Sequence, residues 1–291
     1  MTSERPARLR VGVIGAGRVG SALGAALERA GHVVVAASAV SAQSRARVER
    51  MLPHAQVLAP DEVIAEADFV LLSVPDDALR PLVSGLAAAD VWREGILVAH
   101  TSGAQGIGVL DPAAARGVLA MALHPVMTFA GRPEDLDRLS GATFGVTALD
   151  ELRPVAESLV LEMGGEPVWV PEPARALYHA ALTVGSNHLV TLVNDALSLL
   201  DRAGIDDGQQ LLAPLLSAAL DNVLRLGDGA LTGPVSRGDV ATLATHRRTL
   251  SAQAPEIVPS YLAMARRTAE RAHAAGVLDD ATTESVLEAL S

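Results

Sequence analysis

The glycine spacing near the N-terminus constrains the fold of this 291-residue chain more than any other feature. Residues 9–17, LRVGVIGAG, are an apolar, β-branched run, and the small-residue helix pattern RVGSALGAALERAGH follows directly. Gly15, Gly17 and Gly20 therefore lie between a predicted strand and a predicted helix, and a second strand pattern, HVVVAAS, begins at residue 32. In such a loop the first glycine makes a tight turn, the second admits a pyrophosphate to the helix N-terminus, and the third packs helix against strand. The pattern predicts a dinucleotide-binding site.

The end of the second strand decides which dinucleotide is favoured. NAD enzymes usually carry an Asp or Glu there, which binds the ribose 2′-hydroxyl. This chain has AASAVSAQSRAR instead, with hydroxyl groups and Arg45 but no acid. Hydroxyls and a guanidinium suit a 2′-phosphate, so NADP (as NADPH) is predicted and NAD is less favoured. The alternative is that Arg45 and Arg47 are only solvated residues at a helix start. The predicted cofactor-binding residues are Gly15, Ala16, Gly17, Arg18, Val19, Gly20, Ser38, Ser41, Arg45, Ser73, Val74 and Pro75.

Strand and helix patterns continue to alternate up to about residue 171. Buried strands are predicted within 67–79, 95–103 and 117–129, and GATFGVTA and EPVWVP supply edge strands. In open parallel sheets the ligand lies beyond the carboxyl ends of the strands. Ser73, His100, Ser102 and His124 all fall at such ends, so we expect them at one edge of the sheet.

The second half of the chain reads as helical. Helices are predicted at about 173–202, 208–226, 240–252, 259–275 and 281–290, separated by glycine and proline turns. The predicted fold class is an α/β Rossmann domain, with a mostly parallel doubly wound sheet, followed by an all-α domain. The predicted boundaries are a flexible tail at 1–8, a dinucleotide-binding domain at 9–171 and a helical substrate and dimerisation domain at 172–291.

The first of these helices is apolar on nearly all sides and is expected to be buried. A polar seam crosses it at spacings of three and four, formed by His179, Thr183, Asn187, Thr191, Asn194 and Ser198. One interpretation is that the seam bonds across a dimer or to neighbouring helices; for Asn187, contact with a substrate is favoured. Tyr178 and His188 lie off the seam and are interpreted as packing residues. An apolar helix of this length predicts a C2 homodimer.

Composition excludes several classes of function. Cysteine is absent, which rules out disulfides and thiolate catalysis, and the eight histidines show no metal-ligand spacing, so no metal site is predicted. The net charge of −11 argues against nucleic-acid and anionic-membrane partners. No signal peptide or membrane span is apparent, so a cytoplasmic location is expected. All 23 basic residues are arginine.

The motif set resembles a known family over about residues 9–275. GVIGAGRVGSAL, VPDDAL, HTSG, HPVMTF, SNHL and LTGPVSRGD together resemble a bacterial family of Rossmann-like oxidoreductases with a C-terminal helical domain of unknown function. That family is similar to the 6-phosphogluconate-dehydrogenase-like superfamily, which includes ketopantoate reductase, pyrroline-5-carboxylate reductase and prephenate dehydrogenase. The resemblance implies the architecture and the cofactor class. It also implies a role for His124, which matches a His-Pro motif that meets the substrate's reacting oxygen in prephenate dehydrogenases.

One departure from these relatives concerns the proton donor. Hydroxyisobutyrate-type dehydrogenases and conventional ketopantoate reductases use a lysine as the acid, and this chain has none. Histidine suits proton donation near neutral pH. His124 is the first candidate acid and His100 the second, whereas the alternative for both is a strand-end residue that bonds backbone. Ser102 and Asn187 are predicted to orient the acceptor or the nicotinamide.

The segment LTGPVSRGD is predicted to contribute to the substrate site. Asp239 is explained as the N-cap of the helix that begins at Val240. Arg237 is the predicted clamp for a small anionic substrate, because a planar guanidinium binds a carboxylate bidentately. The alternative is that Arg237 pairs with a neighbouring acid. His246, on the same side of that helix, is predicted to flank the pocket.

These observations predict an NADPH-dependent oxidoreductase that reduces a small 2-oxo or imino carboxylic acid, with a ketopantoate-like acid as the leading substrate. The alternatives are a pyrroline-5-carboxylate-reductase-like imine reductase and a non-catalytic NADP-binding regulator.

Overall fold

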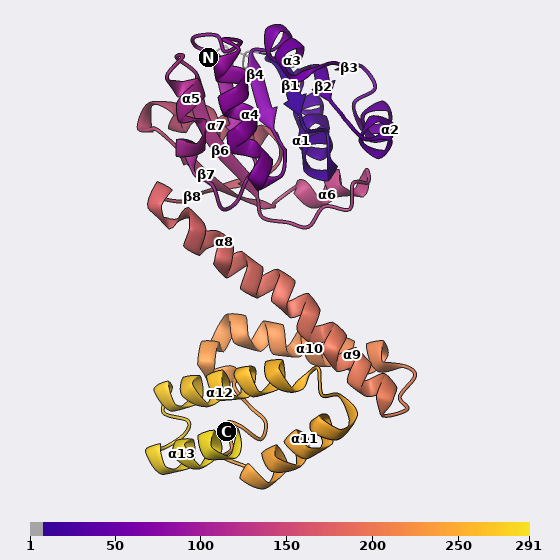
Figure 1. Ribbon diagram of the computed structural model, residues 1–291, viewed down its shortest axis with the longest axis vertical. Helices are drawn as coiled ribbons and strands as arrows, with labels where there is room; N and C mark the ends of the chain where they lie inside the picture. Colours follow the sequence, from indigo (N-terminus) through magenta and orange to yellow (C-terminus); the bar gives the residue numbers. More distant parts are fainter. Residues whose placement is uncertain (1–7) are drawn as a thin grey trace, which may run out of the picture. The chain divides into compact units, whose positions relative to one another are not determined.

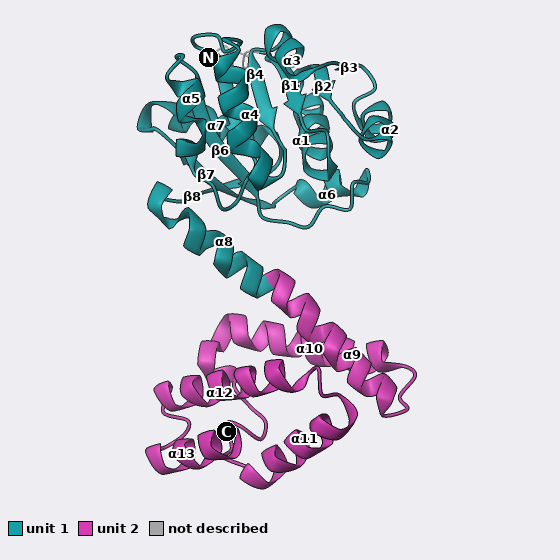
Figure 2. Cartoon of the chain, viewed as in Figure 1, with its two compact units in different colours: residues 1–185 teal, residues 186–291 magenta. Residues whose placement is uncertain are grey.

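A computed structural model describes residues 8–291 of the chain. The chain divides into two compact units, residues 1–185 and residues 186–291 (Figure 2). The predicted tail at residues 1–8 lies, apart from Arg8, outside the described residues. The predicted boundary at residue 171 marks the end of the sheet, whereas the division falls inside the helical run that follows.

The first unit is built on one eight-stranded sheet. Its order is β3-β2-β1-β4-β5-β6-β7-β8, and every neighbouring pair is parallel except β6 and β7. This mostly parallel, doubly wound sheet confirms the predicted α/β class. The strands are β1 (Arg10–Ile14), β2 (Val33–Ser38), β3 (Gln56–Val57), β4 (Phe69–Leu72), β5 (Leu97–His100), β6 (Leu119–Pro125), β7 (Thr143–Ala148) and β8 (Glu166–Trp169).

Helices cover both faces of the sheet because its central strands are apolar on both sides (Figure 1). One core joins the sheet to α1, α2, α6 and α7, and includes Leu23 and Leu159. The other joins the opposite face to α3, α4 and α5, and includes Val63 and Leu79. The helices of this unit are α1 (Arg18–Arg29), α2 (Ala42–Met51), α3 (Pro60–Glu66), α4 (Asp76–Ala88), α5 (Asp111–Ala114), α6 (Glu134–Leu139), α7 (Arg153–Glu162) and α8 (Arg175–Thr183).

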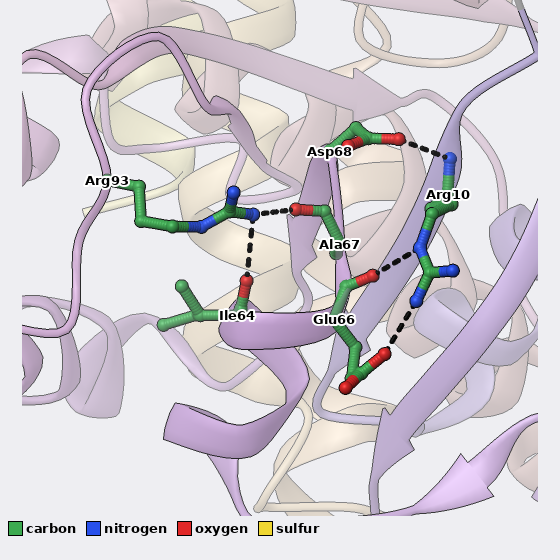
Figure 3. A network of polar contacts seen from close by, with 6 residues as sticks. All are labelled: Arg10, Ile64, Glu66, Ala67, Asp68 and Arg93. Carbon is green, nitrogen blue, oxygen red and sulfur yellow. Dashed lines mark hydrogen bonds and ion pairs between the residues drawn. The ribbon is translucent and has the colours of Figure 1, made fainter.

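Two arginines hold the amino-terminal edge of the sheet, away from the predicted ligand side (Figure 3). Arg10 on β1 donates to the Glu66 carbonyl at 2.8 Å and to the Glu66 carboxylate at 2.5 Å, and its own N–H donates to Asp68. Arg93 donates to the carbonyls of Ile64 and Ala67. Carbonyls at a helix C-terminus lack partners within the helix. The guanidinium groups of Arg10 and Arg93 donate hydrogen bonds to these carbonyls at the end of α3. These hydrogen bonds hold β4 beside β1.

The second unit is helical, as predicted. A long helical run enters it from α8 through a π-helical turn, η4 (Val184–His188), and α9 (Leu189–Arg202). Asp239 caps α11 by accepting from the Thr242 N–H at 3.0 Å, which confirms its predicted structural role. The remaining helices are α10 (Gly208–Leu226), α11 (Val240–Gln253), α12 (Val258–Ala274) and α13 (Asp280–Ala289).

The expectation that the apolar helix is buried is wrong for the single chain. Neither η4 nor α9 has a buried residue, and Leu189 and Val190 are 42% and 59% exposed. The hydroxyl groups of the polar seam bond within their own helix, since Thr183, Thr191 and Ser198 each donate to the carbonyl four residues earlier. These hydroxyls therefore do not need a neighbouring helix to satisfy them. No helix in residues 8–291 is both long enough and apolar enough to cross a membrane.

Candidate functional site

The strand register brings the predicted strand-end residues to one edge of the sheet. Ile14 of β1 lies opposite Leu72 of β4, and Leu72 lies opposite His100 of β5. The residues after these positions, from Gly15 and from Ser73, therefore emerge side by side. Thr101 donates from Oγ1 to Ser73 Oγ at 3.2 Å across this edge. The predicted common edge is confirmed.

The glycine loop between β1 and α1 has the geometry that its spacing predicts. Gly15 has a φ of +89°, and a β-carbon there would lie 2.6 Å from the Ser73 carbonyl oxygen. A β-carbon at Gly20 would lie 2.5 Å from the Gly15 oxygen, so this position also needs glycine to pack α1 on the sheet. Among the described residues, the Gly15 oxygen alone would lie within 4 Å of a β-carbon at Gly17, at 3.9 Å. Gly17 therefore faces open space at the N-terminus of α1, where no side chain caps the free N–H groups. These features fit a dinucleotide pyrophosphate.

Hydroxyl groups and Arg45 occupy the corner after β2. Ser38 is buried at the strand end, and Ser41 caps α2 by accepting from the Ser44 N–H at 3.1 Å. Arg45 is exposed and donates from Nε to the Ala39 carbonyl at 3.3 Å. No Asp or Glu stands between Ser38 and Arg45. The corner is thus free of negative side chains.

Arg47 differs from the solvated residue that the alternative interpretation assumed. It is only 8% exposed, and its Nε is a buried nitrogen without a hydrogen-bond partner among residues 8–291. It lies under the loop that leads to α6, because a β-carbon at Gly131 would be 3.0 Å from Arg47 Nε and from Arg18 Cγ. Arg50 donates to the Gly131 carbonyl at 2.8 Å. Three arginines therefore meet this loop beside the N-terminus of α1.

His100 is fully buried and both of its ring nitrogens are engaged. Nδ1 accepts from the Ser102 N–H at 3.2 Å, so Nε2 carries the proton and donates to the Gly106 carbonyl at 3.0 Å. Burial lowers the pKa of His100 to about 4. Ser102 is also buried, and its hydroxyl oxygen accepts from the Gln105 N–H at 3.0 Å. Both side chains hold the loop after β5, which matches the backbone-bonding alternative for His100.

His124 at the end of β6 is the more accessible histidine and forms a pair with Tyr178 of α8. The distance from His124 Nδ1 to the Tyr178 hydroxyl is 2.8 Å, and the rings meet edge to face with centroids 5.7 Å apart. Gly145 makes room for this contact, since a β-carbon there would lie 2.3 Å from the Tyr178 oxygen. A β-carbon at Gly103 would lie 2.8 Å from His124 Nε2. The second ring nitrogen therefore points toward the loop after β5.

Burial, then the positive charge of Arg175 and the neighbouring His179, lower the pKa of His124 to about 4. Burial raises the pKa of Tyr178. Near pH 7 the pair therefore consists of a neutral imidazole and a neutral phenol.

Arg175 is a buried cation at the centre of this arrangement. It is 1% exposed, and its four hydrogen bonds within residues 8–291 go to uncharged oxygens. The acceptors come from four separate positions along the chain: Ser102 O, Ala122 O, Gly145 O and Thr147 Oγ1. A buried charge is tolerated only when its hydrogen-bonding groups are satisfied. Arg175 thus ties α8, with Tyr178, to β6, to β7 and to the loop after β5.

The remaining predicted residues, Asn187, Arg237 and His246, belong to the second unit. Asn187 and Arg237 are exposed, and His246 Nδ1 lies 2.8 Å from the Tyr261 hydroxyl. Their parts in substrate binding stay predictions. No cluster of metal-ligating side chains is found within residues 8–291.

Sequence reasoning missed Arg175 and assigned Tyr178 to packing. A signal for Arg175 was present, because a basic residue in the first turn of a helix opposes the helix dipole and needs another reason to be there. Tyr178 has no comparable local signal. Its role depends on a contact with a strand 54 residues away in sequence.

Comparison with known proteins supports this architecture. Residues 1–125 match a family model described as a Rossmann-like domain, and residues 142–268 match one described as a domain of unknown function, DUF2520. No curated protein matches the chain.

Several solved structures share the fold at low sequence identity. BF3122 from Bacteroides fragilis, named as a candidate NADP oxidoreductase, is 22% identical with a TM-score of 0.74, over 90% of this chain and 98% of that one. TM1727 from Thermotoga maritima is 19% identical with a TM-score of 0.65, over 91% and 98%. A variant imine reductase from Myxococcus stipitatus in complex with NAD+ is 16% identical with a TM-score of 0.64, over 97% and 100%. The chain therefore matches a Rossmann-like domain over residues 1–125 and a DUF2520 domain over residues 142–268, and it shares the fold of these solved structures.

Proposed function

We propose that this protein is an NADPH-dependent oxidoreductase that reduces a small 2-oxo or imino carboxylic acid, with a ketopantoate-like acid as the leading substrate. The observation that carries the proposal is the meeting, at one sheet edge, of an open glycine loop and the His124–Tyr178 pair. Names of proteins with the same fold support the class, since BF3122 is named for NADP and others are imine reductases.

The residues at the edge fit a nicotinamide dinucleotide. The free N–H groups of α1 beside Gly17 would hold the pyrophosphate, and Ser41, Ser44 and Arg45 would receive the 2′-phosphate without repulsion from an acid. When bound, the reduced cofactor supplies a hydride to the acceptor carbon. The protein's own task is to orient the acceptor and to supply a proton.

His124 supplies that proton in its neutral form. The Tyr178 hydroxyl donates to Nδ1, so Nε2 carries the hydrogen and donates to the acceptor's oxygen or nitrogen. As Nε2 gives up its proton, Nδ1 takes the Tyr178 proton, and the positive charge of Arg175 stabilises the phenolate that remains. Nδ1 then returns its proton to Tyr178, and solvent supplies a new proton to Nε2, which restores the starting state of the pair. This relay replaces the lysine acid that the chain lacks.

The test is NADPH oxidation by the full chain against ketopantoate, pyrroline-5-carboxylate, prephenate and short 2-oxo acids. We expect His124→Ala to lower kcat by roughly 100-fold while the Kd for NADPH changes little, since the imidazole acts on the acceptor rather than on the cofactor. His273→Ala, an exposed histidine of α12, is the matched control and should retain full activity.

Two results would contradict the proposal. A fully active His124→Ala enzyme would remove His124 as donor. NADPH binding without turnover on any member of the panel would favour the non-catalytic regulator instead.

A further inference from the structure

A cavity lined only by residues 192–268 lies within the helical unit. Its volume is about 430 Å³, and residues of α9, α11, α12 and the segments before α11 and α12 line it. Val235, Ile257 and Ala265 are buried in its walls, whereas Met264 is 48% exposed. A largely apolar lining with a few polar groups, at this volume, is typical of a small-molecule site.

The segment LTGPVSRGD forms one wall of the cavity. Gly233 has a φ of +92°, which only glycine adopts without strain, and Pro234 and Val235 follow directly. The turn places these two apolar side chains in the lining, while the Asp239 cap starts α11 a few residues later. Arg237 is exposed and does not line the cavity.

The polar groups of the cavity are mostly hydrogen-bond acceptors. Ser260 and Thr268 have already donated their hydroxyl hydrogens, to the carbonyls of Ile257 at 2.9 Å and Met264 at 2.8 Å. Their oxygens keep free lone pairs. Asp195 of α9 is half-buried in the lining and makes no side-chain hydrogen bond or ion pair with any residue from 8 to 291. A ligand is therefore met by a carboxylate and by hydroxyl oxygens.

His246 and Tyr261 complete the polar side of the cavity. They bond to each other at 2.8 Å, and their rings meet edge to face at 6.0 Å. This pair fixes an aromatic wall, whose faces attract cations. The lining contains neither arginine nor lysine, so a carboxylate ligand would face Asp195 without a cationic partner other than His246.

We propose that this cavity binds a small organic amine, with its apolar body between α9 and α12 and its ammonium group paired with Asp195. The ammonium supplies a positive charge opposite Asp195 and donors for the oxygens of Ser260 and Thr268. The inference needs no part of the proposed reductase activity, because every residue involved lies between 192 and 268.

The experiment compares three probes of the same shape on the full chain without NADPH. 2-Phenylethylamine is the cation, 2-phenylethanol the neutral analogue and phenylacetate the anion, and protein-observed NMR titration gives each Kd. We expect the amine to bind at least tenfold more tightly than the alcohol, and phenylacetate more weakly still. Equal affinities, or a preference for phenylacetate, would overturn the proposal.

Variants locate the site. Asp195→Asn should weaken amine binding by about tenfold and leave 2-phenylethanol unchanged, because only the charge is removed. Asp201→Asn, on the same helix but outside the cavity, is the matched control. Ala196→Phe should fill the cavity and abolish binding of all probes, with thermal unfolding used to verify that the variant is folded.

Unchanged amine binding in Asp195→Asn would place the probe elsewhere and end the proposal. His124→Ala should bind the amine normally, so failure of the reductase proposal and failure of this one give different results.

Discussion

Arg175 shows how one buried side chain can set the chemistry of a neighbouring one. Its four hydrogen bonds to neutral oxygens keep the guanidinium charged, and no carboxylate hydrogen-bonds to it within residues 8–291. Burial and this positive charge together lower the pKa of His124 to about 4, which keeps the imidazole neutral near pH 7. A cation at this position therefore positions α8 and also controls the protonation of the proposed donor.

Replacing Arg175 should change the titration of His124 in a predictable direction. In Arg175→Met the repulsion is lost, so the pKa of His124 should rise from about 4, while burial still holds it below 6.5. Because the neutral form is the active one, the low-pH limit of kcat should move to higher pH. Arg175→Lys keeps the positive charge but loses the planar guanidinium and its several donors. It should therefore leave the low-pH limit of kcat nearly unchanged while lowering the free energy of unfolding. NMR titration of the histidine rings and a pH profile of kcat measure both effects. If His124 has the same pKa in Arg175→Met as in the wild type, Arg175 positions α8 but does not affect the titration of His124.

At the scale of elements, the loop between β1 and α1 separates positions needed for folding from a position needed for binding. Gly20 is packed against Gly15 and Ser73, whereas Gly17 faces open space and has an ordinary φ of −75°. Two substitutions of the same size should therefore fail for different reasons.

We expect Gly17→Ala to fold normally, because no atom opposes the new methyl group, and to bind NADPH at least tenfold more weakly, since the methyl occupies the place of the pyrophosphate. Gly20→Ala should lower the free energy of unfolding by roughly 1–3 kcal/mol through overpacking. Urea unfolding and NADPH titration separate the two effects. A Gly17→Ala protein with full NADPH affinity would show that the loop does not hold the cofactor.

The corner between β2 and α2 should decide cofactor preference. NADPH should bind at least tenfold more tightly than NADH, about 1.4 kcal/mol, because Arg45 and the serines offer only favourable contacts to a 2′-phosphate. Arg45→Ala should weaken NADPH binding and leave NADH binding unchanged, and Arg29→Ala, at the far end of α1, serves as control. Equal affinities of the wild-type protein for the two cofactors would show that the turn between β2 and α2 does not bind the 2′-phosphate.

At the scale of the whole molecule, α10 of the helical unit exposes several leucine side chains. Leu215, Leu220 and Leu224 on α10 are 60%, 52% and 78% exposed. Exposed apolar patches of this kind mark association sites, and a symmetric pair of such patches closes a C2 dimer.

We therefore expect a dimer at micromolar concentration in analytical ultracentrifugation. Leu220→Glu combined with Leu224→Glu should shift the protein to monomer, since burying two carboxylates in an interface is unfavourable. Leu161→Glu, at a comparably exposed leucine of α7, should not. A wild-type monomer under these conditions would contradict the prediction.

Local chemistry by itself determined the order and the type of the elements. The apolar β-branched runs, the glycine spacing and the helix caps act over a few residues. The strands, turns and helices that they form can therefore be predicted from the sequence. The predicted helix at 208–226 matches α10, and the Asp239 cap and the common edge of strand ends were also predicted correctly. The open space at Gly17 also follows from the spacing of Gly15, Gly17 and Gly20, because the turn after β1 involves only neighbouring residues.

Only the tertiary structure decided which polar groups are buried and what they contact. Arg175 reaches acceptors 28 to 73 residues away in sequence, and the neutrality of His124 depends on that distant charge and on burial. The same holds for Arg47, which lies under the loop at Gly131, and for α9, whose apolar sides are exposed in one chain. Desolvation and charge pairing depend on the whole set of neighbours in space. The sequence pattern therefore predicts which residues lie near this site, but it does not predict the distances between them, on which their pKa values and hydrogen bonds depend.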